Sequence, residues 1–338
     1  MNICRNFNLI ERNSVFLKSL FWQIVNSLIK IFLEIFVFDR KIRRILKGNW
    51  AKFFLRKYVK KGCNAPTPQP PPTRGGGDCI TQTSVPSPPP PLPQGEGKII
   101  WQYWESPDST TPPLVQACMN SVEKYRGRCN RIFLTPENVK EYVNIPQIFW
   151  DLKEKGKIKT AFFSDILRTC LLIQHGGIWI DSTVLLTEEL PNYITNADLF
   201  VFQNDLKIDL DGLNMASYFI AAKKDNKILK ETLSALIQYW KENNFLVNYF
   251  TFLHTFTMVT QASKENKEIF AKVPFFNFLS VQQFQGELLN QFTAKRWEEI
   301  KKISGIHKLT HKQSVLTKKK EFDITGTFYE KLIKEEIN

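Results

Sequence analysis

The chain has 338 residues, of which 43% are apolar, so it is long enough to bury a sizeable core. Its formal net charge of +13 would suit a nucleic-acid or membrane partner. Residues 1–62 hold 14 Lys and Arg against 3 acidic residues, whereas residues 98–338 hold 31 against 28. The basic charge therefore belongs to the N-terminal segment, which argues against a nucleic-acid-binding domain and for a membrane surface.

Residues 14–38 are rich in Phe, Leu and Ile but are interrupted by Lys18, Lys30 and Glu34. The longest uncharged run is shorter than the roughly 20 residues that cross a bilayer. Because basic clusters follow, residues 1–62 are predicted to lie as an amphipathic helical segment on an anionic membrane surface, peripheral to the cytoplasmic face of the inner (plasma) membrane. An ordinary helix packed on the protein and a tilted transmembrane helix are the alternatives.

Residues 63–97 are rich in proline and glycine and are predicted to form a disordered linker. A spacer is the favoured interpretation, and a ligand for an SH3-like partner is the alternative. The six cysteines show no C-x-x-C spacing, so they are predicted to be reduced thiols in a cytosolic protein, without a zinc site.

Residues 98–338 are predicted to form one folded domain. It opens with a strand over residues 98–104, then a helical pattern, then a second strand over residues 131–134. This order favours a parallel α/β sheet, and ligands bind such sheets beyond the carboxyl ends of the strands.

The later part of this domain is predicted to hold a strand over residues 214–222 and a helix over residues 226–242, with Asp225 as its N-cap. Tyr249 and His254 are placed on a following aromatic helix. His254 is interpreted equally as a core histidine or as a functional one.

Residues 160–187 are the stretch around which the domain is organised. The pattern predicts an amphipathic helix that ends at Gly176-Gly177, then a buried strand, and then Asp181 where that strand leaves the core. Asp165 and Arg168 stand three residues apart and project from one face of the helix. On spacing alone, an ordinary ion pair followed by a turn aspartate is the favoured interpretation.

A wider set of motifs changes that interpretation. S-D-x-x-R followed by G-G-I-W-I-D-S-T resembles the core of the capsular polysaccharide synthesis glycosyltransferases, a group similar to glycosyltransferase family 32. KIIWQYWE, SYFIAA, NYFTFLHTF and HKLTHK are similar to the same family. The resemblance implies an α/β fold of GT-A type, with a Rossmann-like mixed sheet flanked by helices and a nucleotide-sugar donor at the strand ends.

The family's site residues are carried over onto the matching positions. Asp165 and Arg168 match a pair that holds the ribose and donor sugar, and Asp181 matches the first carboxylate of a D-x-D motif. These three are the candidate catalytic residues. The candidate donor-binding residues are Trp101, Gln102, Tyr103, Trp104, Ser164, Gly177 and Lys308. The candidate acceptor-side residues are Tyr249 and His254.

The resemblance also implies a divalent cation, Mn²⁺ or Mg²⁺, that would neutralise the leaving diphosphate. Its candidate ligands are Asp181, Thr183 and His307. Thr183 stands where the motif has its second aspartate, so the sequence leaves open whether a metal binds directly.

The expected activity is transfer of a hexose or N-acetylhexosamine from a nucleoside diphosphate to a capsular or other surface polysaccharide, or to its lipid-linked precursor. Resemblance to family 32 implies retention of anomeric configuration. Two alternatives stay open. One is a glycosyltransferase that modifies protein, and the other is an inactive scaffold of polysaccharide assembly that has lost its metal carboxylate.

Overall fold

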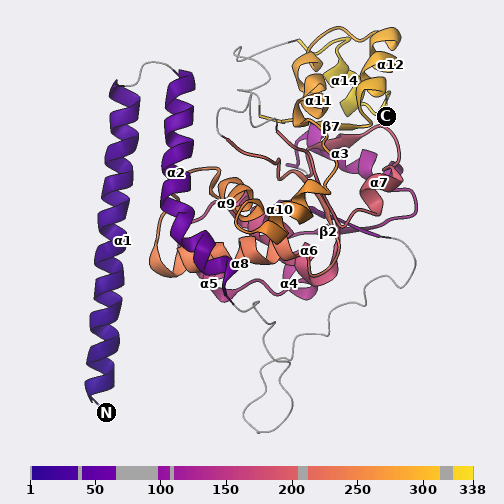
Figure 1. The fold of residues 1–338 in the computed structure, drawn as a ribbon. Coiled ribbons are helices and arrows are strands. Elements are labelled where there is room, and N and C mark those ends of the chain that lie inside the picture. The colour runs from indigo at the N-terminus through magenta and orange to yellow at the C-terminus, as the bar shows by residue number, and fades with distance from the viewer. Residues whose placement is uncertain are drawn as a thin grey trace, which may run out of the picture.

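The computed structural model describes residues 2–36, 40–65, 98–106, 110–204, 212–312 and 323–337. Nearly all of the predicted linker therefore lies outside the described residues. Figure 1 shows helices gathered around a sheet, with the two N-terminal helices at one side and the C-terminal elements at another.

The main sheet is mixed. In the described chain its strand order is β2 (Asn130–Leu134), β1 (Ile99–Tyr103), β3 (Gly177–Ile180), β6 (Phe219–Ala222) and β5 (Leu199–Val201). β1 runs parallel to β2 and β3, whereas β6 runs antiparallel to β3 and β5. The predicted α/β class with a mixed sheet is confirmed. The all-parallel order that strand–helix alternation favours is wrong for β5 and β6.

The central strands bury side chains on both faces, because successive residues of a strand point to opposite sides. Trp101 and Trp179 belong to a core that includes residues of α2, α6, α8 and α9. Ile100, Ile178 and Ile180 belong to a second core on the other face, with residues of α3, α7 and α11. Two buried faces explain why the β3 sequence is continuously apolar.

Helices cover both faces of the sheet. Their bounds are α3 (Pro113–Lys124), α4 (Val139–Tyr142), α5 (Gln147–Glu154), α6 (Thr160–His175), α7 (Asn192–Thr195), α8 (Lys227–Glu242), α9 (Thr251–Thr260), α10 (Lys264–Ala271), α11 (Phe278–Gln282), η1 (Gln283–Glu287), α12 (Ala294–Ile303) and α14 (Phe328–Ile333). The N-cap of α8 is Asn226, whose side chain accepts from the Leu229 N–H, and not Asp225 as predicted. Asp225 instead has a positive φ of 63° in the preceding turn.

The predicted helix–glycine–strand unit is confirmed. The N–H of Gly176 donates to the Leu172 carbonyl and ends α6, with a φ of 70° that favours glycine. Gly177 has a φ of 104°, and a Cβ there would lie 2.4 Å from the Ile99 carbonyl oxygen. Glycine is needed at both positions to turn the chain sharply into β3.

A second, two-stranded sheet lies beyond the end of β3. β4 (Val184–Leu186) pairs antiparallel with β7 (Ile306–Lys308), so that Val184 faces Lys308. This pairing brings a segment from late in the chain beside the residues that follow Asp181. An aromatic cluster with residues of η1, α12 and α14 packs behind it.

The two N-terminal helices, α1 (Asn2–Phe36) and α2 (Arg40–Cys63), lie side by side (Figure 1). α2 is part of the main core, where Phe54, Leu55 and Tyr58 are buried and the Phe54 and Tyr58 rings pack against the ring of Tyr239. Gly62 lies so close to α8 that a Cβ there would be 2.5 Å from the backbone nitrogen of Ala235. The basic segment predicted to end at residue 62 is therefore not structurally separate, because α2 packs in the same core as the domain.

α1 is the outer of these two helices. The Ser19 hydroxyl donates to the Asn244 side chain at 2.9 Å, and the Trp50 indole of α2 donates to Asn26 at 2.8 Å. The opposite side of α1 exposes large apolar side chains, namely Leu17, Leu20, Phe21, Ile24, Leu28, Ile31 and Phe32. We call these residues the α1 stripe. None of the described helices is long and apolar enough to cross a membrane.

Candidate active site

The candidate site lies at the carboxyl ends of β1 and β3. The N–H of Asp181 donates to the Tyr218 carbonyl at 2.9 Å, which fixes the residue directly after β3. The Ser182 hydroxyl donates to the Tyr103 carbonyl at 2.9 Å, which ties the end of β1 to the same turn. This is the edge of the sheet where the strand order predicts a ligand.

Arg168 joins the two predicted carboxylates. Its guanidinium donates to Asp165 one turn earlier on α6, and also to Asp181 Oδ1 at 3.1 Å. It lies 5.0 Å from the centre of the Trp179 ring. Only 5% of the Arg168 side chain is exposed, so this is a buried ion cluster and not a surface pair. Removing one member of such a cluster leaves a buried charge uncompensated.

Asp181 receives two further hydrogen bonds. The Trp179 indole N–H donates to Asp181 Oδ1 at 2.8 Å, and Lys308 Nζ donates to Asp181 Oδ2 at 3.1 Å. Lys308 Nζ also donates to the Thr183 hydroxyl and lies 5.4 Å from the centre of the Tyr218 ring. The side chains of Asp181 and Lys308 are 23% and 21% exposed, so a ligand can reach both.

The two carboxyls differ in their pKa values. Burial raises the pKa of Asp165 to about 6, against the opposing effect of Arg168 and with a further increase from the negative charge of Asp181. Burial also acts on Asp181, but Lys308 and Arg168 outweigh it and hold the pKa of Asp181 below its usual value. At neutral pH the site therefore has a firmly ionised Asp181 beside a second carboxylate that titrates near pH 6.

This arrangement does not fit direct metal binding by Asp181, Thr183 and His307. Both oxygens of Asp181 and the hydroxyl of Thr183 already face cationic donors, so a divalent ion there would meet two positive charges. No group of three or more His, Cys, Asp or Glu side chains that suits a metal occurs among the described residues. A cation held by Asp181 and Thr183 would have to displace Lys308.

His307 is the clearest correction to the predicted set. It neighbours Lys308 on β7 and so points to the other face of that strand. It is 1% exposed in the aromatic cluster, with its ring 5.4 Å from that of Phe284 and 6.4 Å from that of Trp297. Burial lowers the pKa of His307 to about 4. It is a neutral core residue that the structure does not bring to Asp181.

The four predicted donor-binding residues in β1 and directly after it fall into two groups, one buried in the core and one at the candidate site. Trp101 is fully buried and donates to the Gly176 carbonyl at 2.9 Å, while Gln102 is fully buried and accepts from Arg131 at 2.7 Å. Tyr103 is 6% exposed and contributes its carbonyl to the Ser182 hydroxyl. Trp104 is half-buried at the end of the strand. Of these four, Tyr103 and Trp104 lie at the edge that carries Asp181.

Two other predicted donor-binding residues have different positions. Ser164 is half-buried on α6, directly before Asp165. Gly177 starts β3, whereas Asp181 follows its end, so four steps along the chain of about 3.3 Å each separate them. Gly177 therefore acts in the turn between α6 and β3 and lies away from the carboxylates.

The acceptor-side candidates also differ from each other. Tyr249 is 69% exposed and precedes α9, so it is not on the helix as predicted. Burial and the negative charges of Asp165 and Asp181 raise its pKa, against the opposing effect of Arg168. His254 lies inside α9 and is fully buried, which agrees with the core interpretation.

Sequence reasoning missed Trp179 and Tyr218. Trp179 stands two residues before Asp181, and this spacing puts both side chains on the same side of an extended chain. That signal was present in G-G-I-W-I-D. Tyr218 carries no comparable signal, because its place beside Lys308 depends on the antiparallel pairing of β6 with β3.

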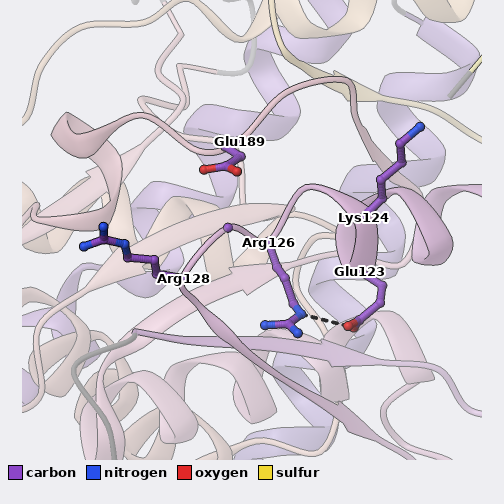
Figure 2. Close-up of a pocket in the computed structure, with 6 residues that line it drawn as sticks. Glu123, Lys124, Arg126, Arg128 and Glu189 are labelled. Atoms are coloured by element: carbon purple, nitrogen blue, oxygen red, sulfur yellow. Dashed lines mark hydrogen bonds and ion pairs between the residues drawn. The ribbon is translucent and has the colours of Figure 1, made fainter.

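A separate polar hollow of about 340 Å³ lies before β2, at the amino ends of the parallel strands. It is lined by Glu123, Lys124, Arg126, Gly127, Arg128 and Glu189. Figure 2 shows the Arg126 side chain directed at Glu123, to which it donates at 2.7 Å. The hollow lies at the opposite edge of the sheet from Asp181, so it is not the site described above.

Comparison with known proteins gives one family. Residues 82–332 match the model of the family described as "Capsular polysaccharide synthesis protein". A search of curated proteins finds no match. Among solved structures, one titled "PaToxG Glycosyltransferase" matches 78% of this chain and 95% of its own, at 16% identity and a TM-score of 0.38. That likeness is too distant to carry an argument.

Proposed function

The chain belongs to the capsular polysaccharide synthesis protein family, and we propose that it is a glycosyltransferase of surface polysaccharide assembly. Its donor would be a nucleoside-diphosphate hexose or N-acetylhexosamine. Its acceptor would be a capsular or other surface polysaccharide, or the lipid-linked precursor of one. The family match supports this role, and the ion cluster at the carboxyl end of β3 supports the chemistry.

The observation that carries the proposal is the cluster of Asp165, Arg168, Asp181 and Lys308. A diphosphate leaving group gains negative charge as it departs, and preorganised cations stabilise such charge strongly. Lys308 and Arg168 would supply that stabilisation. The carboxylates would accept hydrogen bonds from sugar hydroxyls, which are donors as well as acceptors.

The proposed reaction keeps the anomeric configuration. The bond between the anomeric carbon and the diphosphate oxygen breaks, and a bond from the acceptor oxygen forms on the same face of the sugar. The acceptor proton passes to the departing diphosphate oxygen. This course needs no side-chain nucleophile, and both carboxylates of the site are already held by Arg168.

We also propose that the protein lies on the cytoplasmic face of the inner membrane. The α1 stripe is an apolar surface on an outer helix, with Lys18 and Lys30 on the same helix. An amphipathic helix of this kind binds an anionic bilayer through buried apolar area and lysine charge. The proposed acceptor would then be presented beside the domain that modifies it.

Donor binding by the full chain tests this proposal. UDP- and GDP-sugars are titrated in the presence of a chelator and again with Mn²⁺. We expect one donor to bind without metal, and Lys308→Met to weaken that binding by about tenfold to 100-fold, as loss of a charged hydrogen bond does. Lys302→Met, a change to an exposed lysine of α12, is the matched control and should have little effect.

Three other results would contradict parts of the proposal. Binding that requires Mn²⁺ would restore the metal site predicted from the sequence. Sugar transfer to a protein acceptor would favour the protein-modifying alternative. A folded chain that binds no donor would favour the inactive scaffold.

A further inference from the structure

A cavity of about 530 Å³ lies at the end of the two-stranded sheet that is away from Asp181. Its volume falls in the roughly 300–1,000 Å³ range of pockets that bind small molecules. Its walls come from the segments after β4, after β5 and before α11, and from α7, α11, α12 and the start of β7. We call it the β7 cavity. Segments far apart in the sequence therefore form it together.

One wall of the β7 cavity presents an aromatic face. Tyr193 is 50% exposed and stacks on Phe276, with ring centres 4.9 Å apart and an angle of 4° between the planes. Phe200 packs against both rings, at 6.2 Å from Tyr193 and 5.7 Å from Phe276. The plane of the Tyr193 ring is therefore fixed before a ligand binds, which lowers the entropy cost of binding. The face of an aromatic ring is negative, so it attracts the C–H groups on the flat side of a sugar ring.

The polar lining of the β7 cavity carries charges of both signs. Glu188, Glu189 and Glu298 line it together with Lys301 and Lys302. Glu298 and Lys301 form an ion pair at 2.7 Å. Three carboxylates and two amines nearly balance, so the cavity has no strong preference for an anion or a cation. Sugar hydroxyls both donate and accept hydrogen bonds, so one sugar can use both kinds of group.

A chain of contacts connects the β7 cavity to the candidate site. Phe202 lines the cavity and stacks on Tyr218, whose ring centre lies 5.4 Å from Lys308 Nζ. Ile306 also lines the cavity, and Lys308, two residues later, projects from the same face of β7. These two positions are about 7 Å apart along the strand. The cavity is therefore separate from Asp181, but a saccharide chain of a few sugars is long enough to occupy both places.

We infer that the β7 cavity binds a stretch of the acceptor saccharide chain, away from the sugar that reacts. Tyr193 would stack on one sugar, and Glu188 and Lys302 would form hydrogen bonds with its hydroxyls. The inference rests on the proposed glycosyltransferase function, and it adds a second place at which that enzyme holds its polymer. Binding away from the reacting end would favour long acceptors over short ones.

The test is affinity electrophoresis of the full chain in native gels that contain the surface polysaccharide extracted from the source organism. The polysaccharide should retard the wild type, and Tyr193→Ala should raise the dissociation constant by about tenfold. Tyr193→Phe keeps the ring and should stay within about twofold of the wild type. Phe275→Ala is the matched control with the same limit, because Phe275 is 57% exposed beside Phe276 but is not among the residues that line the cavity.

Glu188→Gln tests the polar wall without loss of side-chain size. It should raise the dissociation constant by about threefold to tenfold, because an amide oxygen is a weaker acceptor than a carboxylate. This variant keeps the test decisive if Tyr193→Ala does not fold.

Three results would overturn the inference. These are a wild type that the polysaccharide does not retard, equal losses in Tyr193→Ala and Phe275→Ala, and equal retardation by gelatin, which would show a peptide-binding surface. Donor titration keeps this test separate from the proposed function, because Tyr193→Ala should bind nucleotide sugar as the wild type does. Donor binding without retardation would reject the cavity and keep the transferase. Retardation that depends on Tyr193 in a chain that binds no donor would reject the transferase and keep the cavity.

Discussion

The candidate site and the outer face of α1 both depart from the usual distribution, in which charged side chains are exposed and large apolar side chains are buried. The site buries charged groups, among them Arg168 with 5% of its side chain exposed. The α1 stripe exposes apolar groups, among them Leu28 at 59%. Buried charges and exposed apolar patches are both unfavourable in a protein alone, and both commonly mark sites of interaction.

α2 shows how an N-terminal helix packs on the domain, although its Phe53 is 63% exposed. Its Phe54, Leu55 and Tyr58 are buried against the domain, whereas the apolar residues of the α1 stripe have no such cover. The difference teaches that the N-terminal segment has two roles. α2 belongs to the core, and α1 provides a surface whose apolar area suits a bilayer.

Asp181→Asn should have the largest effect and would test the polar half of this comparison. It removes the charge that Arg168 and Lys308 share, while the amide keeps the size of the carboxylate. Sugar transfer, measured as kcat/KM with the identified donor, should fall by about 10²–10³, as for loss of an electrostatic contact in an active site.

Asp198→Asn, an exposed carboxylate paired with Lys223, is the matched control and should leave transfer unchanged. If Asp181→Asn keeps more than a third of wild-type activity, the ion cluster is structural and the comparison fails at the site.

Replacement of Ile24, Leu28 and Ile31 by serine tests the other side of the comparison, the exposed α1 stripe. At about 1 kcal/mol for each side chain, binding to phosphatidylglycerol vesicles should weaken on the order of 100-fold. The melting temperature should change little, because all three side chains are exposed.

The control is a triple serine variant of Phe275, Leu279 and Ile303, which are also exposed but lie outside the N-terminal helices. Equal vesicle binding by both variants would show that the α1 stripe has no special contact with the bilayer. A large drop in melting temperature for the α1 variant alone would show that the stripe belongs to the fold.

His307→Phe should have the smallest effect on activity and sharpens the boundary of the site. Transfer should stay within about threefold of wild type, because His307 lies in the aromatic cluster and has no contact with Asp181. A loss comparable to that of Asp181→Asn would return His307 to the metal site.

The same variant should change stability in acid. An unfolded histidine has a pKa of about 6.5, and that of buried His307 is about 4. The unfolded state therefore binds more protons between these values, so wild-type stability falls as the pH drops from 6.5 to 4, by up to about 3 kcal/mol. The phenylalanine variant should lack this loss in urea unfolding at pH 7 and pH 4.5. An identical pH dependence in both proteins would contradict the assignment.

Local patterns were sufficient for much of the fold. The unit of α6, the two glycines and β3 was predictable because the apolar period, the glycine stop and the short buried strand all agree. The end of β3 at Asp181 followed from the same pattern. The antiparallel direction of β5 and β6 was not predictable, because it depends on how distant segments return to the sheet.

The site was predictable where its residues lie close in sequence. Asp165, Arg168 and Asp181 come from one continuous stretch, and the structure brings them together with Lys308. His307 and Lys308 look equivalent in the sequence, and only the pairing of β7 with β4 decides which one faces Asp181. The packing of α2 on α8 was hidden for the same reason, since basic composition does not reveal a buried face.

The close contact of Gly62 with the backbone of Ala235 has a consequence for where the reaction takes place. Two helices that touch without an intervening side chain cannot slide or tilt past one another easily. α2 therefore connects α1 rigidly to α8 and α9. If α1 rests on a bilayer, α2 and α8 hold α6, which carries Asp165 and Arg168, at a fixed height above it, and that height limits which acceptor sugar the enzyme can reach.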